Sequence, residues 1–190
     1  RLAFYGCSSL TSVTIPDGVT SIRAWAFNGC SSLTSITIPN SVAEIENRAF
    51  YECNSLPIID NLRYADTYAV EVIDKSLNTY TIKDGTRFIG SEAFYDCTSL
   101  TSITIPDSVT SIGNSAFYNC SGLKNITIPD SVADIVNYAF ENCSSLIRVT
   151  IGNGVTSIGE AAFNGCSSLT EVYCKPTTPP TGGSSMFSGN

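Results

Sequence analysis

Cysteine and histidine carry much of the metal-binding, nucleophilic and acid–base chemistry of proteins, and this chain of 190 residues has eight cysteines and no histidine. The lack of histidine removes the commonest general base and the commonest metal ligand, which excludes many classes of enzyme. Zinc sites need clustered cysteines, commonly as Cys-x-x-Cys pairs, and no such pair occurs. The sequence therefore predicts no metal, no cofactor and no catalytic residue.

Seven of the cysteines occur at one offset of an internal repeat: Cys7, Cys30, Cys53, Cys97, Cys120, Cys143 and Cys166. Stacked repeats would place equivalent Cα atoms about 5 Å apart, within disulfide range, but their Cβ vectors would run parallel instead of converging. We therefore predict a ladder of free, buried thiols, with a disulfide between adjacent coils as the alternative. Cys174 lies five residues after Leu169, as Ile38 lies after Leu33, and is predicted to replace a core isoleucine.

Aspartates form a second column, at Asp17, Asp84, Asp107 and Asp130. A row of carboxylates could bind calcium, but the Gly-Gly-x-Gly-x-Asp signature of calcium-binding β-rolls is absent. We interpret these residues as acids that close turns and face water.

Composition limits the partners of the chain. The formal net charge is -7 with 14% charged residues, so no basic stripe is available for phosphates and a nucleic-acid partner is not expected. No apolar run approaches the roughly 18 to 20 residues of a membrane span, so direct membrane insertion is not expected either. The sequence opens inside a repeat without a signal peptide, and we expect it to be part of a larger exported protein.

The elements that position these residues repeat with a period of 23, which is typical of a solenoid. Each unit predicts a strand of the form Leu-x-x-Ile-x-Ile, a turn at Pro-Asp or Pro-Asn, and an Ala-Phe-x-x-Cys turn with room for one or two helical turns. Eight leucines open such strands: Leu10, Leu33, Leu56, Leu77, Leu100, Leu123, Leu146 and Leu169. The sequence therefore predicts one solenoid over residues 1–175, about eight coils with a parallel sheet on one face, and the start of a cap or linker over 176–190.

One coil departs from the rule. Residues 57–76 lack the Ala-Phe-x-x-Cys turn, and the spacing from Leu56 to Leu77 falls to 21. The Tyr68, Val70, Val72 alternation predicts an extra strand on the back or edge of the solenoid.

Candidate binding residues lie at the outward positions of the strands, which are mostly Ser and Thr. The positions that break this monotony, and are therefore candidates for ligand binding, are Ile58, Asp60, Asn125, Arg148, Glu171 and Tyr173. A plain, solvated strand surface is the alternative. Tyr5, Tyr51, Tyr95, Tyr118 and Tyr138 could also present an aromatic strip, although packing over the turns explains them equally well.

The unit from Ala93 to Gly113 combines Phe, Cys, Pro and Ile at fixed offsets and resembles the BspA-like, or Treponema-type, leucine-rich repeat. The resemblance covers residues 1 to about 175. It implies a right-handed leucine-rich repeat solenoid, with a parallel sheet on one face and short helical or 3-10 turns on the other, in a bacterial protein that is secreted or displayed at the cell surface. Some members of the family adhere to host matrix proteins or to other cells, and the resemblance carries over no catalytic residue.

We therefore predict a non-catalytic recognition or adhesion module that binds a host matrix or cell-surface protein or glycan through a face of the repeats. The alternative is a structural stalk without a ligand of its own. A solenoid enzyme that acts on polysaccharide would need acids and bases clustered in one groove, and Arg148 with Glu171 alone is poor material for that chemistry.

Overall fold

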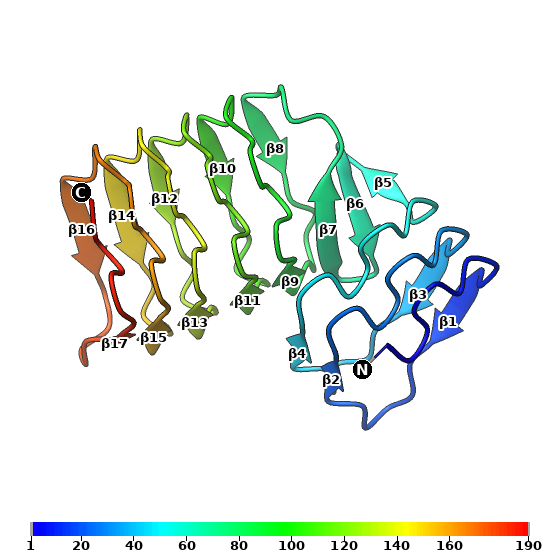
Figure 1. The fold of residues 1–190 in the computed structure, drawn as a ribbon. Coiled ribbons are helices and arrows are strands. Elements are labelled where there is room, and N and C mark those ends of the chain that lie inside the picture. Colours follow the sequence, from blue (N-terminus) through cyan, green and yellow to red (C-terminus); the bar gives the residue numbers. More distant parts are fainter. Residues whose placement is uncertain (1, 190) are drawn as a thin grey trace.

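The structure is a computed structural model that describes residues 2–189. The chain forms a solenoid in which each regular coil contributes a front strand, a rear strand and a turn (Figure 1). No helix occurs among residues 2–189, so the short helical or 3-10 turns expected around Ala-Phe-x-x-Cys are hydrogen-bonded turns instead.

The front row consists of seven strands that pair in parallel with a register of 23 residues, as in Ser12 with Ser35 and Asn125 with Arg148. Their bounds are β1 Ser12–Thr14, β3 Ser35–Thr37, β8 Thr79–Thr81, β10 Ser102–Thr104, β12 Asn125–Thr127, β14 Arg148–Ile151 and β16 Glu171–Cys174. The row is divided into three ladders, β1-β3, β8-β10 and β12-β14-β16. The prediction of one continuous sheet of eight front strands is therefore wrong, because the coil that starts at Leu56 leaves the row.

The rear row consists of shorter parallel strands. Their bounds are β2 Ser21–Ile22, β4 Glu44–Ile45, β9 Phe88–Ile89, β11 Ser111–Ile112, β13 Asp134–Ile135, β15 Ser157–Ile158 and β17 Thr181–Gly182. Strands β9, β11, β13, β15 and β17 belong to one sheet with β7, whereas β2 and β4 pair only with each other. Both rows are therefore interrupted at the irregular coil, and the front row is interrupted again between β10 and β12.

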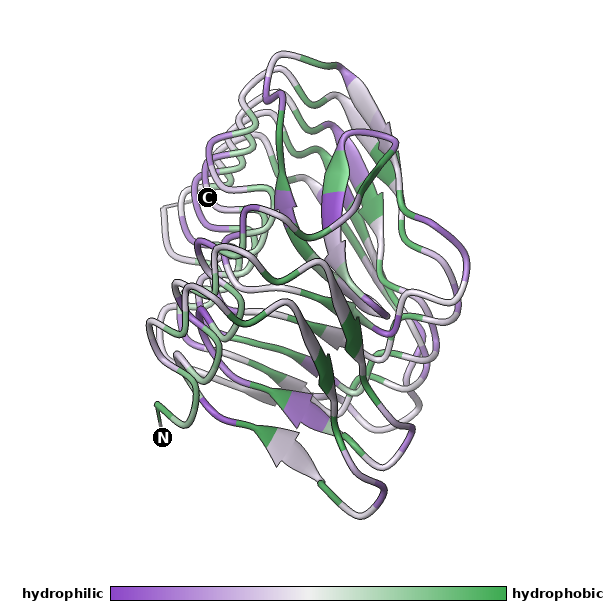
Figure 2. Cartoon of the chain, turned by 90° about the vertical axis from the view of Figure 1, so that its right-hand side faces the viewer, coloured by the Kyte–Doolittle hydropathy of each residue, from purple (hydrophilic) through white to green (hydrophobic). Residues whose placement is uncertain are grey.

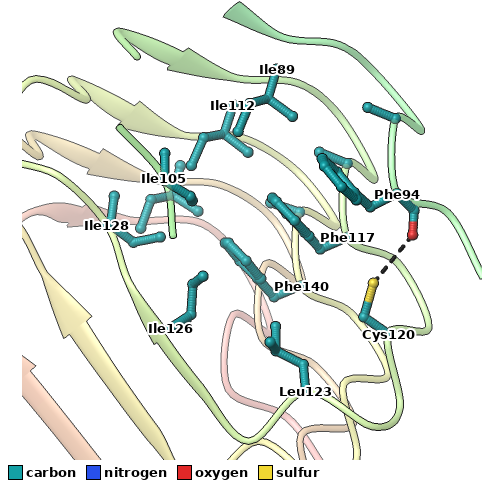
Figure 3. Close-up of a cluster of buried hydrophobic side chains, with 14 of the residues drawn as sticks. Ile89, Phe94, Ile105, Ile112, Phe117, Cys120, Leu123, Ile126, Ile128 and Phe140 are labelled. Atoms are coloured by element: carbon teal, nitrogen blue, oxygen red, sulfur yellow. Dashed lines mark hydrogen bonds between the residues drawn. The ribbon is translucent and has the colours of Figure 1, made fainter. Parts of the chain in front are cut away.

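The predicted alternation of the strands is confirmed by their burial. In β12 the central Ile126 is 2% exposed, while Asn125 and Thr127 face solvent. Inward isoleucines of the front and rear rows meet between the two rows, as Ile112, Ile126 and Ile128 do in Figure 3. Figure 2 shows that hydrophobic and hydrophilic segments alternate along each coil and recur from coil to coil.

The turns stack through phenylalanine. Phe94, Phe117 and Phe140 lie with their rings parallel and their centroids 4.8 and 5.1 Å apart. Two residues of each turn have positive φ. They lie two positions before and two positions after the phenylalanine, as Ser115 (53°) and Asn119 (55°) do around Phe117. The later position often carries glycine, asparagine or aspartate, the residues that tolerate this geometry best.

The irregular coil forms an antiparallel meander. Its strands are β5 Ile58–Ile59, β6 Leu62–Ala65 and β7 Tyr68–Val72, and β7 then pairs in parallel with β9. Asp60 and Asn61 have φ values of 49° and 68°, so a two-residue turn with both residues in the left-handed region joins β5 to β6. The predicted extra strand is present, at Tyr68–Val72, together with a second one that the sequence analysis did not predict.

This meander separates two hydrophobic cores. The first contains the coils before it and ends on Tyr68 and Phe88, and the second begins with Leu62 and Tyr64. Figure 1 shows the strands β1 to β4 inclined to the rest of the stack at this point. The meander is thus a shared wall on which both parts of the solenoid pack.

Residues 176–189, which the sequence analysis expects to begin a cap or linker, lie on the stack. Strand β17 pairs with β15, and the ring of Phe187 stacks on Phe163 at 5.4 Å. The amide of Phe163 donates to the carbonyl of Met186 at 2.8 Å, as equivalent turns do elsewhere.

Candidate functional site

Three predicted site residues share one column of the front row. Asn125, Arg148 and Glu171 are register partners on β12, β14 and β16, and their side chains point away from the core. Tyr173 is the register partner of Thr150 and lies two residues along β16 on the same face. A one-face cluster therefore forms near the end of the stack, as the sequence predicts.

The members of this cluster contact one another. Arg148 Nε donates to Glu171 Oε2 at 2.6 Å, Tyr173 OH donates to the same oxygen at 3.2 Å, and the guanidinium lies 5.7 Å from the tyrosine ring centroid. All three side chains remain accessible, and Tyr173 is 55% exposed. The cluster offers a cation, a carboxylate and an aromatic face in a fixed arrangement, which suits recognition of a polar ligand.

The ion pair sets the charge of this cluster. The hydrogen bond from Arg148, with its positive charge, holds the pKa of Glu171 below its ordinary value of 4.5. Because the folded pKa is the lower one, the pair stabilises the fold above pH 4.5, and that contribution is lost as the pH falls through the lowered pKa. At neutral pH Glu171 is therefore ionised.

Replacing Arg148 with alanine should raise the pKa of Glu171 toward its ordinary value, because both the hydrogen bond and the opposite charge are removed. The measurement is a carbon-13 NMR titration of the side-chain carboxyl. Lys175→Ala is the matched control, since Lys175 contacts Asp130 instead. An unchanged Glu171 titration in Arg148→Ala would contradict the geometry of the cluster.

Ile58 and Asp60 lie elsewhere. Ile58, which is 52% exposed, belongs to the antiparallel strand β5 and faces Arg63 across the pair. Asp60 lies in the turn after β5 and is not an outward strand residue. The structure therefore places these two residues on the meander and does not bring them together with the cluster on β14 and β16.

The tyrosines form two groups on the turn side. Tyr95 and Tyr118 stack with ring centroids 4.9 Å apart, whereas Tyr51 lies in the earlier coils. Arg48 lies 5.5 Å from the Tyr51 ring and 5.3 Å from the ring of Trp25, which the sequence analysis did not single out. Trp25 is the single tryptophan of the chain, and this rarity was the sequence signal that could have pointed to it.

Between these groups lies a small cleft, which we call the notch. It separates the Phe50 turn (residues 48–52) from the Phe94 turn (residues 92–96), and its volume is about 130 Å³. Its lining includes Arg48, Tyr51, Val70, Lys75, Glu92 and Tyr95. The 44-residue spacing between Phe50 and Phe94 was the sequence signal for it, because one turn is missing there.

A wider hollow than the notch lies on the rear row, where the two parts of the stack meet. Its volume is about 630 Å³, and its lining includes the polar residues Glu44, Asn47, Asn114, Asp134 and Asn137. Asp134 already accepts a hydrogen bond from Ser157 Oγ at 2.6 Å. The hollow contains no aromatic side chain in its lining among the described residues, so it offers a ligand fewer kinds of contact than the front cluster does.

The predicted ladder of free, buried thiols is confirmed for six of its seven cysteines, but it is wrong for Cys7, which is exposed because no described coil packs against it on its outer side. All eight cysteines are free, and the six from Cys30 to Cys166 are buried. Cys120 Sγ, for example, donates to the carbonyl of Phe94 at 3.2 Å (Figure 3). Burial raises the pKa of Cys53 and of Cys97 to about 12, which keeps both protonated and unreactive near neutral pH.

Cys174 corrects one prediction. It is the register partner of Ile151, as expected for a residue in place of a core isoleucine, but it is exposed. No described strand follows β16 in the front row, so nothing covers this inward position, and Val172 beside it is 45% exposed for the same reason.

Alkylation with iodoacetamide at pH 8 should therefore label Cys7 and Cys174 in the folded protein and leave the buried thiols unlabelled. All eight should react after denaturation, and mass spectrometry counts the adducts. Fewer than eight adducts in denaturant without reductant would show a disulfide and contradict the ladder of free thiols.

The aspartate column shows no shared site. Asp130 accepts a hydrogen bond from the amide of Asn153 at 2.8 Å and contacts Lys175 Nζ at 3.3 Å, and these two interactions lower its pKa. Over residues 2–189 no group of three or more His, Cys, Asp or Glu side chains is arranged to hold a metal ion. The same part of the chain contains no helix long and apolar enough to cross a membrane.

Comparison with known proteins identifies the repeat. Six copies of the family described as "BspA type Leucine rich repeat region" match residues 1–86 and 66–190. No curated protein matches the chain.

Three solved structures are similar to this chain. A leucine rich cell surface protein from Faecalibacterium prausnitzii A2-165 is 30% identical, with a TM-score of 0.51, over 92% of this chain and 62% of that one. The pneumococcal vaccine antigen PcpA is 18% identical, with a TM-score of 0.55, over 93% and 55% of the two chains. The leucine rich repeat protein of T. pallidum is 29% identical, with a TM-score of 0.45, over 88% and 69%. This chain thus spans between 55% and 69% of these relatives' own lengths.

The repeat match spans the chain, and the fold agrees with it in its parallel front strands, its phenylalanine stack and its column of buried thiols. The protein belongs to the BspA-type leucine-rich repeat family.

Proposed function

We propose that the chain is a recognition module of a secreted or cell-surface bacterial protein, which binds a protein or glycan ligand, host-derived or from another cell, through the front cluster of Arg148, Glu171 and Tyr173. The observation that carries the proposal is the contact of these three exposed side chains on one rigid face. The family supports a protein-interaction role, and the F. prausnitzii relative is described as a cell surface protein. Leucine-rich repeat proteins are generally non-catalytic, so we assign no reaction to the cluster.

The front cluster differs from the neighbouring strand surface in composition, and its side chains are held in place. The neighbouring front strands present Ser and Thr, which offer hydroxyl groups but little apolar area. Tyrosine and arginine contribute most to binding energy in many interfaces, since they combine apolar area with hydrogen bonding. The parallel ladder β12-β14-β16 fixes both side chains before a ligand arrives, so little conformational entropy is lost on binding. Asn125, in the same column, would extend the contact.

The experiment compares the wild-type chain with an Arg148→Ala, Glu171→Ala, Tyr173→Ala variant on an array of extracellular-matrix proteins and glycans. Loss of three central contacts should weaken binding by about a hundredfold or more. The matched control is Thr79→Ala, Thr81→Ala, on the outward face of β8 in the same row. Equal binding by both variants, with folding unchanged by circular dichroism, would favour a stalk and contradict the proposal.

A further inference from the structure

Backbone amides link neighbouring turns throughout the stack. In the Phe94 turn the amides of Glu92, Phe94 and Asp96 donate to carbonyls of the next turn at 3.0, 2.7 and 2.9 Å. The same pattern of three bonds joins four other turns to the next turn along the stack. The first donors of these four turns are Trp25, Ser115, Tyr138 and Ala161. Each regular turn thus presents alternate N–H groups to the turn after it.

The Phe50 turn breaks this pattern. Its equivalent amides belong to Arg48, Phe50 and Glu52, and none of them donates to another group in residues 2–189. The next turn along the stack is the Phe94 turn, across the notch, because the irregular coil has no turn of its own. Three donors that are satisfied in the five junctions above therefore lie along the edge of the Phe50 turn, and two of their residues, Arg48 and Phe50, line the notch.

Two carbonyls of the opposite wall are engaged by other donors. The carbonyl of Ala93 accepts the amide of Val72 at 2.9 Å, and the carbonyl of Tyr95 accepts Lys75 Nζ at 2.5 Å. A group that satisfies the three amides must therefore come from outside these two turns and must supply acceptors.

The notch is held open by side chains of both walls. Arg48 Nη2 contacts both oxygens of Glu92 at 2.9 and 3.0 Å, and Ser91 Oγ donates to Asn47 Oδ1 at 2.7 Å. The ring of Tyr68 lies 5.4 Å from Phe50 and occupies the place of the missing phenylalanine. Compared with a regular junction, the notch therefore lacks the backbone of one turn, whereas the position of that turn's phenylalanine ring is occupied by Tyr68.

The charges around the notch argue against a small anion. Glu71 and Glu92 line it, and both cations of the lining are engaged, Arg48 with Glu92 and Lys75 with the carbonyl of Tyr95. Donors on alternate residues of one edge fit a row of backbone carbonyls, as when a peptide adds to a sheet edge, and do not converge on one ion. We propose that the notch binds a peptide segment of a partner protein, which places alternate backbone carbonyls on the amides of Arg48, Phe50 and Glu52.

This inference does not depend on the role of the front cluster, since the notch lies on the turn side. The probe is a synthetic nine-residue peptide with the sequence of residues 113–121, a regular turn, carrying Phe117→Ala because Tyr68 fills the aromatic position, and Cys120→Ser. The readout is amide hydrogen exchange by NMR. Without peptide, the three amides should exchange about a hundredfold faster than those of Phe27 and Phe117, whose bonds are made. Saturating peptide should slow them by about tenfold or more.

Val70→Trp, which fills the floor of the notch, should abolish this slowing, whereas Thr127→Trp on the front row should not. The exchange of Phe117 reports whether each variant is folded. Amides already protected without peptide, or rates unchanged at millimolar peptide, would overturn the proposal. Slowing by maltohexaose instead of the peptide would also overturn it, because the occupant would then be a glycan.

Discussion

Replacing Phe117 with alanine should lower the free energy of unfolding by about 4 kcal/mol, among the largest effects of any single substitution in this chain. Phe117 is fully buried, and its ring is stacked between those of Phe94 and Phe140. The loss has two sources, the apolar area removed from the core and the cavity left between two rings that cannot close on each other. Urea unfolding followed by circular dichroism measures it.

Phe4→Ala is the matched control for this prediction. Phe4 has the same place in its turn and stacks on Phe27 at 5.1 Å, but it is 40% exposed and has a neighbour on one side only. Its loss should cost about 1 kcal/mol. Equal effects of the two substitutions would mean that the phenylalanine stack does not carry the stability that its burial indicates.

Replacing Arg63 with alanine should cost about 3 kcal/mol, because a buried guanidinium would leave several partners unpaired. Arg63 is 8% exposed and donates from Nε to Glu71 at 2.9 Å and from Nη1 to the carbonyl of Leu56 at 3.1 Å, with a further bond to the carbonyl of Asn54. It therefore joins the meander to the coil before it, at the wall between the two cores.

Arg148→Ala provides the comparison, since its ion pair with Glu171 has the same chemistry but is half-exposed. Exposed pairs contribute little to stability because solvent screens them, so this variant should unfold almost as the wild type does. The same urea titration applies to both. If Arg63→Ala were no less stable than Arg148→Ala, the meander would not depend on Arg63 for its attachment.

Arg63 also shows why part of the fold could be predicted and part could not. The regular coils follow from local information, since Leu123, Ile126 and Phe117 recur at fixed offsets and each offset has one inward direction. The predicted parallel front strands, buried thiols and leucine-rich repeat fold are confirmed on that basis.

The meander depends on contacts between residues far apart in the sequence. At the break, the side chains of Asp66, Arg87 and Arg63 make hydrogen bonds to backbone groups in place of the missing strand ladder. Asp66 accepts a hydrogen bond from the amide of Ile38 at 2.8 Å, and Arg87 donates to the carbonyl of Val42 at 2.8 Å. With Arg63 they satisfy groups that a regular coil would have paired. No periodic pattern marks such substitutions, so the antiparallel pairing of β5 and β6 could not be read from spacing.

The candidate site was predicted in part for the same reason. Arg148, Glu171 and Tyr173 lie on regular strands, so their common face follows from the repeat. Ile58 and Asp60 were placed by extending that repeat into a coil that leaves it, and the structure moves them to the meander. The notch was not predicted, because its amides are backbone groups without a residue type to mark them.

The central claim is that this solenoid has a ligand of its own. The most direct measurement applies the fluorescently labelled chain to an array of extracellular-matrix proteins and glycans and competes it with the same chain unlabelled. We predict saturable binding to at least one array component, removed by an excess of unlabelled chain and retained by the Thr79→Ala, Thr81→Ala control. Binding that neither saturates nor competes on any component would contradict the claim and leave the solenoid as a spacer.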